Sequence, residues 1–126
     1  MRCLIVDDSA VFVHAACHLL EHHGITVAGV ASTSQEALRR FEELAPDVAL
    51  VDVELGEESG FELAEALVAT GSQASVILVS THTAEQFADM IAASAAAGFI
   101  CKSDLTGDAI TALVDGSTKR PEGDQR

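Results

Sequence analysis

The chain has 126 residues, of which 48% are hydrophobic, and this size and composition predict one domain with a single core. Its 20 acidic residues against 7 basic ones give a net charge of −13, which argues against a nucleic-acid partner because phosphate binding needs clustered lysine and arginine. No apolar stretch approaches ~18 residues and no signal-peptide pattern precedes the fold, so we expect a soluble, cytoplasmic protein without membrane contact.

Strand-like and helix-like segments alternate from the N-terminus. Short runs of leucine, isoleucine and valine without polar alternation predict strands that are buried on both faces. These runs lie at residues 2–6, 26–30, 48–51, 75–79 and 98–101. Segments with apolar residues spaced three and four apart predict helices. These segments lie at residues 10–23, 33–45, 61–69, 83–97 and 106–115.

The first two predicted helices have clear boundary signals. Gly24 ends the first one. The second opens with a capping box, in which Thr33 precedes Glu36 by three residues, and it cannot pass Pro46. The apolar face of the first helix is expected to hold Phe12, Ala16, Leu19 and Leu20. The residues expected to be buried by the second are Ala37, Leu38, Phe41 and Leu44.

The later helices differ in what flanks them. A loop at residues 54–60 leads into the third helix, and the fourth opens with a second capping box, Thr83 with Gln86, and stops at Gly98. Residues 117–126 have too little apolar content to pack. We therefore expect a domain over residues 1–116 followed by a polar, disordered tail. Met1 and the short tail favour a stand-alone domain over the first part of a longer protein.

Five strand–helix units in this order predict an α/β fold of the doubly wound, flavodoxin-like type. Right-handed crossovers place helices on both faces of a parallel sheet. Of the two common strand orders we expect 2-1-3-4-5, in which the first and third strands lie side by side. The carboxyl ends of the strands then meet at one edge of the sheet, where ligand sites of such sheets form.

Polar side chains follow four of the predicted strands directly. Asp7 and Asp8 follow the first, Asp52 the third, Ser80 the fourth and Lys102 the fifth. Clustered carboxylates repel one another unless a cation is present, and Mg²⁺ is the cation that oxygen ligands favour. Lys102 and Ser80 offer a charge and a hydroxyl to a transferred phosphoryl group. An aspartate near its reference pKa of ~3.9 is already ionised at neutral pH, so Asp52 is the expected nucleophile.

These residues, together with Phe99 inside the last strand, resemble the receiver domain of two-component response regulators over about residues 2–115. The resemblance implies a CheY-like fold and a domain that is a signalling switch rather than an enzyme. It implies that Asp52 is the phosphoacceptor, Lys102 binds the phosphoryl group, and Ser80 and Phe99 form a switch pair. The Mg²⁺ ligands that it implies are Asp7, Asp8, Asp52 and the backbone carbonyl of Glu54.

The resemblance also implies the partners. A histidine kinase or histidine phosphotransfer protein would donate the phosphoryl group. The surface formed by the fourth helix, fifth strand and fifth helix would bind a downstream protein or a second copy of the chain. Two alternatives stay open: a receiver-like domain that binds a partner without phosphorylation, and a phosphatase-like enzyme with Asp52 as nucleophile and Glu54 as acid–base.

Three residues depart from the family pattern. Thr81 follows the switch hydroxyl where a very small residue is usual, Ser103 stands where a cis-proline is common, and Gly56 stands where proline is frequent. None of them removes a reactive group. They bear on the rates of phosphorylation and hydrolysis and on the geometry of the loop.

Histidines and cysteines form the last group of candidate residues. His14, His18 and His22 recur every four residues, opposite the apolar face of the first helix. Such spacing can bind a transition metal, but we favour a solvated or partner-contacting surface. No CxxC spacing exists, so the cysteines are expected to be buried free thiols. They are Cys3, Cys17 and Cys101.

Overall fold

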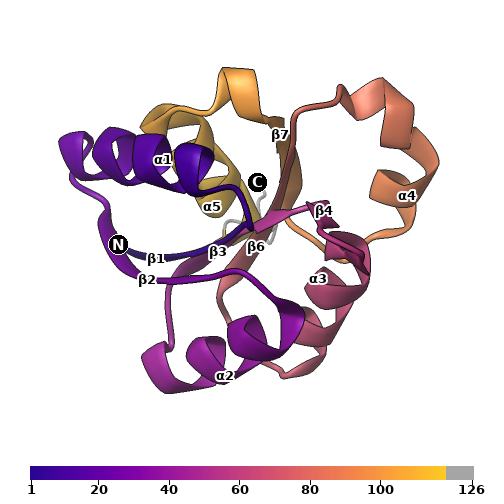
Figure 1. The fold of residues 1–126 in the computed structure, drawn as a ribbon, viewed down its shortest axis with the longest axis horizontal. Coiled ribbons are helices and arrows are strands. Elements are labelled where there is room, and N and C mark those ends of the chain that lie inside the picture. The colour runs from indigo at the N-terminus through magenta and orange to yellow at the C-terminus, as the bar shows by residue number, and fades with distance from the viewer. Residues whose placement is uncertain (119–126) are drawn as a thin grey trace, which may run out of the picture.

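The computed structural model describes residues 1–118, apart from the side chains of residues 117 and 118. Its main element is a five-stranded parallel sheet with the strand order β2-β1-β3-β6-β7 (Figure 1). The strands are β1 (Arg2–Val6), β2 (Thr26–Ala31), β3 (Val48–Asp52), β6 (Ser75–Ser80) and β7 (Gly98–Cys101). The helices are α1 (Ala10–His22), α2 (Ser34–Leu44), α3 (Gly60–Ala69), α4 (Ala88–Ala93) and α5 (Gly107–Thr118). This confirms the predicted doubly wound α/β fold, because the five main strands stand in the expected order.

Helices cover both faces of the sheet and bury two apolar layers. One face carries α1 and α5, and the other carries α2 and α3 (Figure 1). Because side chains alternate along a strand, Ile5 and Leu50 face the first pair of helices while Leu4 and Val51 face the second. Every residue of the central strands β3 and β6 is buried, as their uninterrupted apolar sequences predict.

The capping boxes behave differently in the two helices for which they were predicted. At α2 the Thr33 hydroxyl accepts a hydrogen bond from the amide of Glu36 at 3.1 Å, as expected. The Glu36 carboxylate in turn accepts from the amide of Ser32 at 2.9 Å.

One residue of α2 is not where the sequence predicted it. The prediction that Leu38 is buried is wrong, since 38% of it is exposed. It lies ~100° around the helix from Ala37, outside the stripe that faces the sheet.

The fourth helix is shorter than predicted. The Thr83 side chain makes no capping hydrogen bond, and the chain first forms a 3₁₀ helix, η1 (Ala84–Phe87), before α4. The helix ends at Ala93 rather than at Gly98. The chain then extends, because the Glu65 carboxylate accepts from the amide of Ala95 at 2.7 Å and the amide of Ala97 donates to Val76 in the sheet at 2.7 Å.

The remaining differences lie in loops and at the end of the chain. The predicted loop at residues 54–60 contains a small hairpin, β4 (Glu54–Leu55) with β5 (Glu58–Ser59), and a 3₁₀ turn, η2 (Lys102–Asp104), follows β7. Helix α5 extends to residue 118, beyond the predicted end of the domain. The rest of the predicted tail, residues 119–126, lies outside the described residues. No helix within residues 1–118 is long and apolar enough to cross a membrane.

Candidate functional site

Three carboxylates meet at the carboxyl edge of the sheet. Asp7 and Asp8 follow β1 directly, and Asp52 is the last residue of β3. The two strands are parallel neighbours in which Val6 pairs with Val51, so their ends are level. One carboxylate oxygen of each aspartate lies within 4.8 Å of the others. Asp7 and Asp52 are buried and Asp8 is exposed, so the cluster, here called the acidic pocket, opens to solvent on one side.

Lys102 is held across the acidic pocket. Its Nζ lies 2.7 Å from Oδ2 of Asp7 and 3.4 Å from Oδ2 of Asp52. The same Nζ lies 4.3 Å above the centre of the Phe12 ring, which comes from α1. The two ion pairs and the cation–π contact fix the ammonium group within reach of any anion that approaches Asp52.

The environment of Asp52 perturbs its acidity. Burial raises the pKa of its carboxyl to about 6, and the nearby negative charge of Asp7 adds to the rise. A hydrogen bond of 3.1 Å from the amide of Glu54 to Oδ1 opposes this shift, as does Lys102. The sequence-based assumption of a pKa near its reference value is therefore wrong, because the sequence does not report burial. The carboxyl is still mostly ionised above pH 7.

The acidic pocket is suited to a hard divalent cation. Asp7 accepts a hydrogen bond at Oδ1 from the amide of Ser9 at 2.8 Å. Its Oδ2 is fully buried and, within the described residues, makes no hydrogen bond of regular geometry, although the Lys102 ammonium lies 2.7 Å away. Clustered carboxylate oxygens are the ligands that Mg²⁺ prefers, so the residues present fit this ion. Glu54 begins β4 two residues beyond Asp52, with its side chain largely exposed.

Ser80 and Phe99 lie on neighbouring strands next to the pocket. Ser80 ends β6 and is buried, and its hydroxyl accepts a hydrogen bond from the amide of His82 at 3.0 Å. Phe99 is half-buried in β7 opposite Leu78, two residues before Ser80 on the same face of the sheet. Its ring centroid lies 6.5 Å from that of Phe87 in η1. The two side chains are therefore diagonal neighbours beneath the segment that holds η1 and α4.

The sequence reading missed three residues around this site. Phe12 lies beneath Lys102, although its spacing had marked it only as core. His82 has its Nδ1 3.5 Å from the Ser80 hydroxyl and 3.8 Å from Oε1 of Glu54. Gly60 is packed so closely that an added Cβ would come within 1.9 Å of the backbone oxygen of Asp52. For Gly60 the sequence did contain a signal, because Ser59-Gly60 forms the turn that opens α3.

The three departures from the family pattern have simple local settings. Gly56 has a φ of +59°, which glycine adopts without strain and proline cannot adopt. Thr81 and Ser103 are both exposed. No cis peptide bond occurs within residues 1–118.

The exposure predicted for the three histidines is confirmed, whereas the burial predicted for the three cysteines holds only for Cys3. His14, His18 and His22 are exposed, as expected. Cys3 is buried and burial raises the pKa of its thiol to about 12, whereas Cys17 and Cys101 are half-buried rather than buried. All three are free thiols.

Comparisons with known proteins agree on one family. The model of the response regulator receiver domain matches residues 3–114. A protein-glutamate methylesterase/protein-glutamine glutaminase of Caulobacter vibrioides is 39% identical over 66% of this chain and 24% of its own length. The transcriptional regulatory protein YvfU of Bacillus subtilis is 31% identical over 92% of this chain and 60% of its own length. The chain thus spans between a quarter and about three fifths of these relatives.

Solved structures give the same result. The receiver domain of NarL from Mycobacterium tuberculosis superposes with a TM-score of 0.81 at 27% identity, covering 94% of this chain and 97% of that one. A CheY-like receiver domain from Methanospirillum hungatei gives 0.79 at 26% identity, covering 97% and 98%.

Proposed function

The chain belongs to the family of response regulator receiver domains, and from this premise we propose that it is a phosphorylation-dependent switch with Asp52 as the phosphoacceptor. The observation that carries the proposal is the position of the Asp52 carboxylate, buried at the end of β3 between two other carboxylates and the Lys102 ammonium. A histidine kinase or histidine phosphotransfer protein is the proposed phosphodonor. After phosphorylation, the domain is proposed to bind a downstream protein or a second copy of this chain.

Asp52 is proposed to act as a nucleophile without a general base. With a pKa of about 6, most of its carboxyl is ionised above pH 7. A carboxylate oxygen forms a bond to phosphorus while the bond from phosphorus to the donor atom breaks, and the donor leaves with that electron pair. The product is an acyl phosphate on Asp52.

Lys102 and Ser80 are proposed to bind the transferred group. Lys102 is already 3.4 Å from Oδ2 of Asp52, so it can shift from Asp7 toward the new phosphoryl oxygens without crossing the pocket. The Ser80 hydroxyl accepts a hydrogen bond from the amide of His82, and it can donate its own hydrogen to one of them. Both groups neutralise or bind oxygens that carry charge in the transition state.

Mg²⁺ is the proposed cofactor, held by Asp7, Asp8, Asp52 and the backbone carbonyl of Glu54. When bound, the ion neutralises negative charge on the phosphoryl group. The clustering of three carboxylate oxygens within 4.8 Å of one another supports this assignment. The three aspartates otherwise repel each other, and Lys102 is the one ammonium that contacts Asp7 and Asp52 among the described ion pairs.

The signal is proposed to leave through Ser80 and Phe99. Movement of the Ser80 hydroxyl toward Asp52 opens space beside Phe99, whose ring contacts Phe87 of η1. The surface of α4, β7 and α5 then changes its shape and its binding preference. The alternative is that the domain binds a partner without phosphorylation. Thr81 departs from the family pattern, but it is exposed and removes no reactive group from the acidic pocket.

Intact mass measured after incubation with acetyl phosphate and Mg²⁺ tests the proposal. We expect one added phosphoryl group on the parent chain and none on the Asp52→Asn variant. Glu57→Gln serves as a matched control, because Glu57 is an exposed acid in the hairpin next to the pocket. An unchanged mass for the parent chain with both acetyl phosphate and phosphoramidate would leave binding without phosphorylation as the function.

A further inference from the structure

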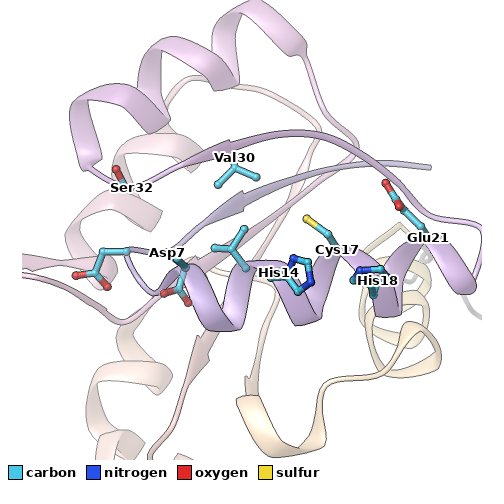
Figure 2. Close-up of a pocket in the computed structure, with 10 residues that line it drawn as sticks. Asp7, His14, Cys17, His18, Glu21, Val30 and Ser32 are labelled. Atoms are coloured by element: carbon cyan, nitrogen blue, oxygen red, sulfur yellow. The ribbon is translucent and has the colours of Figure 1, made fainter.

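Helix α1 carries a pair of imidazoles that the acidic pocket does not use. His14 and His18 lie one turn apart on the same side of α1 (Figure 2). Their ring centroids are 4.8 Å apart and their planes are inclined by 70°. Two nitrogens bound to one Zn²⁺ at ~2.0–2.1 Å can be at most ~4 Å apart. Rings this close can each turn one nitrogen toward a common ion.

The helix favours this pair over the other pair with the same spacing. His14 and His18 lie inside the 13-residue helix α1, where the backbone is fixed by hydrogen bonds on both sides. His22 is the last residue of α1, at the end where helices fray. His14 and His18 also line a common groove of about 500 Å³, which His22 does not line.

The groove has a charge that suits a cation. It lies between α1 and the end of β2, with Val30 and Ser32 opposite the helix (Figure 2). Besides the two imidazoles, its ionisable lining groups are carboxylates and one thiol. They are Asp7, Asp8, Glu21 and Cys17. Within the described part of the chain, no lysine or arginine lines the groove, so no ammonium or guanidinium competes with an incoming metal ion.

Cys17 is not needed as a ligand. Its thiol is half-buried, whereas both imidazoles are exposed to solvent, from which a hydrated metal ion approaches. Glu21 lies one turn beyond His18 and contributes negative charge near the imidazoles.

We propose that His14 and His18 together chelate a divalent transition-metal ion such as Zn²⁺, Ni²⁺ or Cu²⁺, with water completing its coordination. Imidazole nitrogen is a good ligand for these ions, whereas Mg²⁺ selects oxygen. The chain thus offers two sites of different chemistry: carboxylates at the end of β1 and β3 for a hard ion, and imidazoles on α1 for a borderline one. The second site does not depend on phosphorylation of Asp52.

Calorimetric titration of Ni²⁺ into the full chain tests this inference. The titration is made in excess Mg²⁺, so that the acidic pocket does not contribute. We expect one Ni²⁺ per chain, with the same affinity in Asp52→Asn. If Ni²⁺ binds without Mg²⁺ but not in excess Mg²⁺, or if it binds the parent chain but not Asp52→Asn, the ion belongs to the acidic pocket and the proposal is wrong.

Histidine variants then locate the ion. His14→Gln and His18→Gln are each expected to weaken Ni²⁺ binding at least about tenfold, whereas the matched control His22→Gln changes it less than about twofold. All three side chains are exposed, so urea midpoints without metal should match that of the parent chain. Equal affinity in all variants, or a loss confined to His22→Gln, would refute the assignment. In the parent chain, Zn²⁺ should also shift the imidazole resonances of His14 and His18 but not that of His23.

Discussion

Replacing Asp52 with asparagine should make the domain more stable. The carboxyl of Asp52 loses water on folding and lies beside Asp7, and these effects outweigh the Glu54 amide and Lys102, so the pKa rises from 3.8 to about 6. A rise of about two pKa units corresponds to ~3 kcal/mol of stability lost when the group is ionised. Because only 6% of Asp52 is exposed, solvent screening reduces this figure little. Asparagine has nearly the same shape and carries no charge.

The sign of the effect depends on pH in a definite way. Between about pH 4 and pH 6 the unfolded chain has released the Asp52 proton while the folded chain still holds it, so stability falls as pH rises through this window. Asp52→Asn has no such proton. Its advantage should be complete above about pH 6 and absent below about pH 4.

Urea and thermal unfolding of both proteins in chelator measure the difference. At pH 7.5 we expect a gain of ~3 kcal/mol in the free energy of unfolding, or roughly 10 °C in Tm for a domain of this size. The exposed control Glu57→Gln should stay within ~0.5 kcal/mol of the parent chain. A neutral or negative effect of Asp52→Asn at pH 7.5, or a gain that persists at pH 3.5, would refute the electrostatic account of the pocket.

Three further predictions concern single residues. Asp8→Ala should abolish Mg²⁺-dependent phosphorylation measured by intact mass, while circular dichroism stays unchanged because Asp8 is exposed; normal phosphorylation of this variant in chelator would remove the metal from the mechanism. Phe99→Ala should still accept a phosphoryl group but lose the amide shifts that beryllofluoride induces over residues 83–115, and intact shifts would contradict coupling through Phe99. Gly60→Ala should lower the free energy of unfolding by at least ~2 kcal/mol, because its Cβ would overlap the Asp52 carbonyl, whereas Gly116→Ala, in open space on α5, should be neutral or stabilising.

The sequence predicted the fold because the strands are regular and their ends are polar. Uninterrupted apolar runs indicated buried parallel strands, and Asp7, Asp52 and Lys102 each follow such a run directly. The strand order was an additional choice, since pairing between strands depends on contacts distant in sequence. The structure confirms that choice through the register of β1 with β3.

Features that depend on tertiary contacts were not predictable from local patterns. The fourth helix ends earlier than predicted because contacts from Glu65 and Val76 hold residues 95–97 in an extended path. Leu38 shows that an apolar residue on an amphipathic helix can still face water. The contact between Lys102 and the Phe12 ring joins residues 90 positions apart, and nothing near either residue signals it.

The hydrogen bonds that Glu65 accepts at the end of α4 affect how much energy residues 84–97 need to move. Neither η1 nor the six-residue α4 buries a single residue completely, and isolated helices shorter than ~12–15 residues are marginal in water. The segment is held by the packing of Phe87, Ile91 and Ala96 against the core and by the Glu65 carboxylate of α3, which also accepts from the Ser94 hydroxyl at 3.3 Å. Residues 84–97 therefore form a unit that can unfold locally while the sheet stays intact, and its amides should exchange with solvent long before those of β3 and β6.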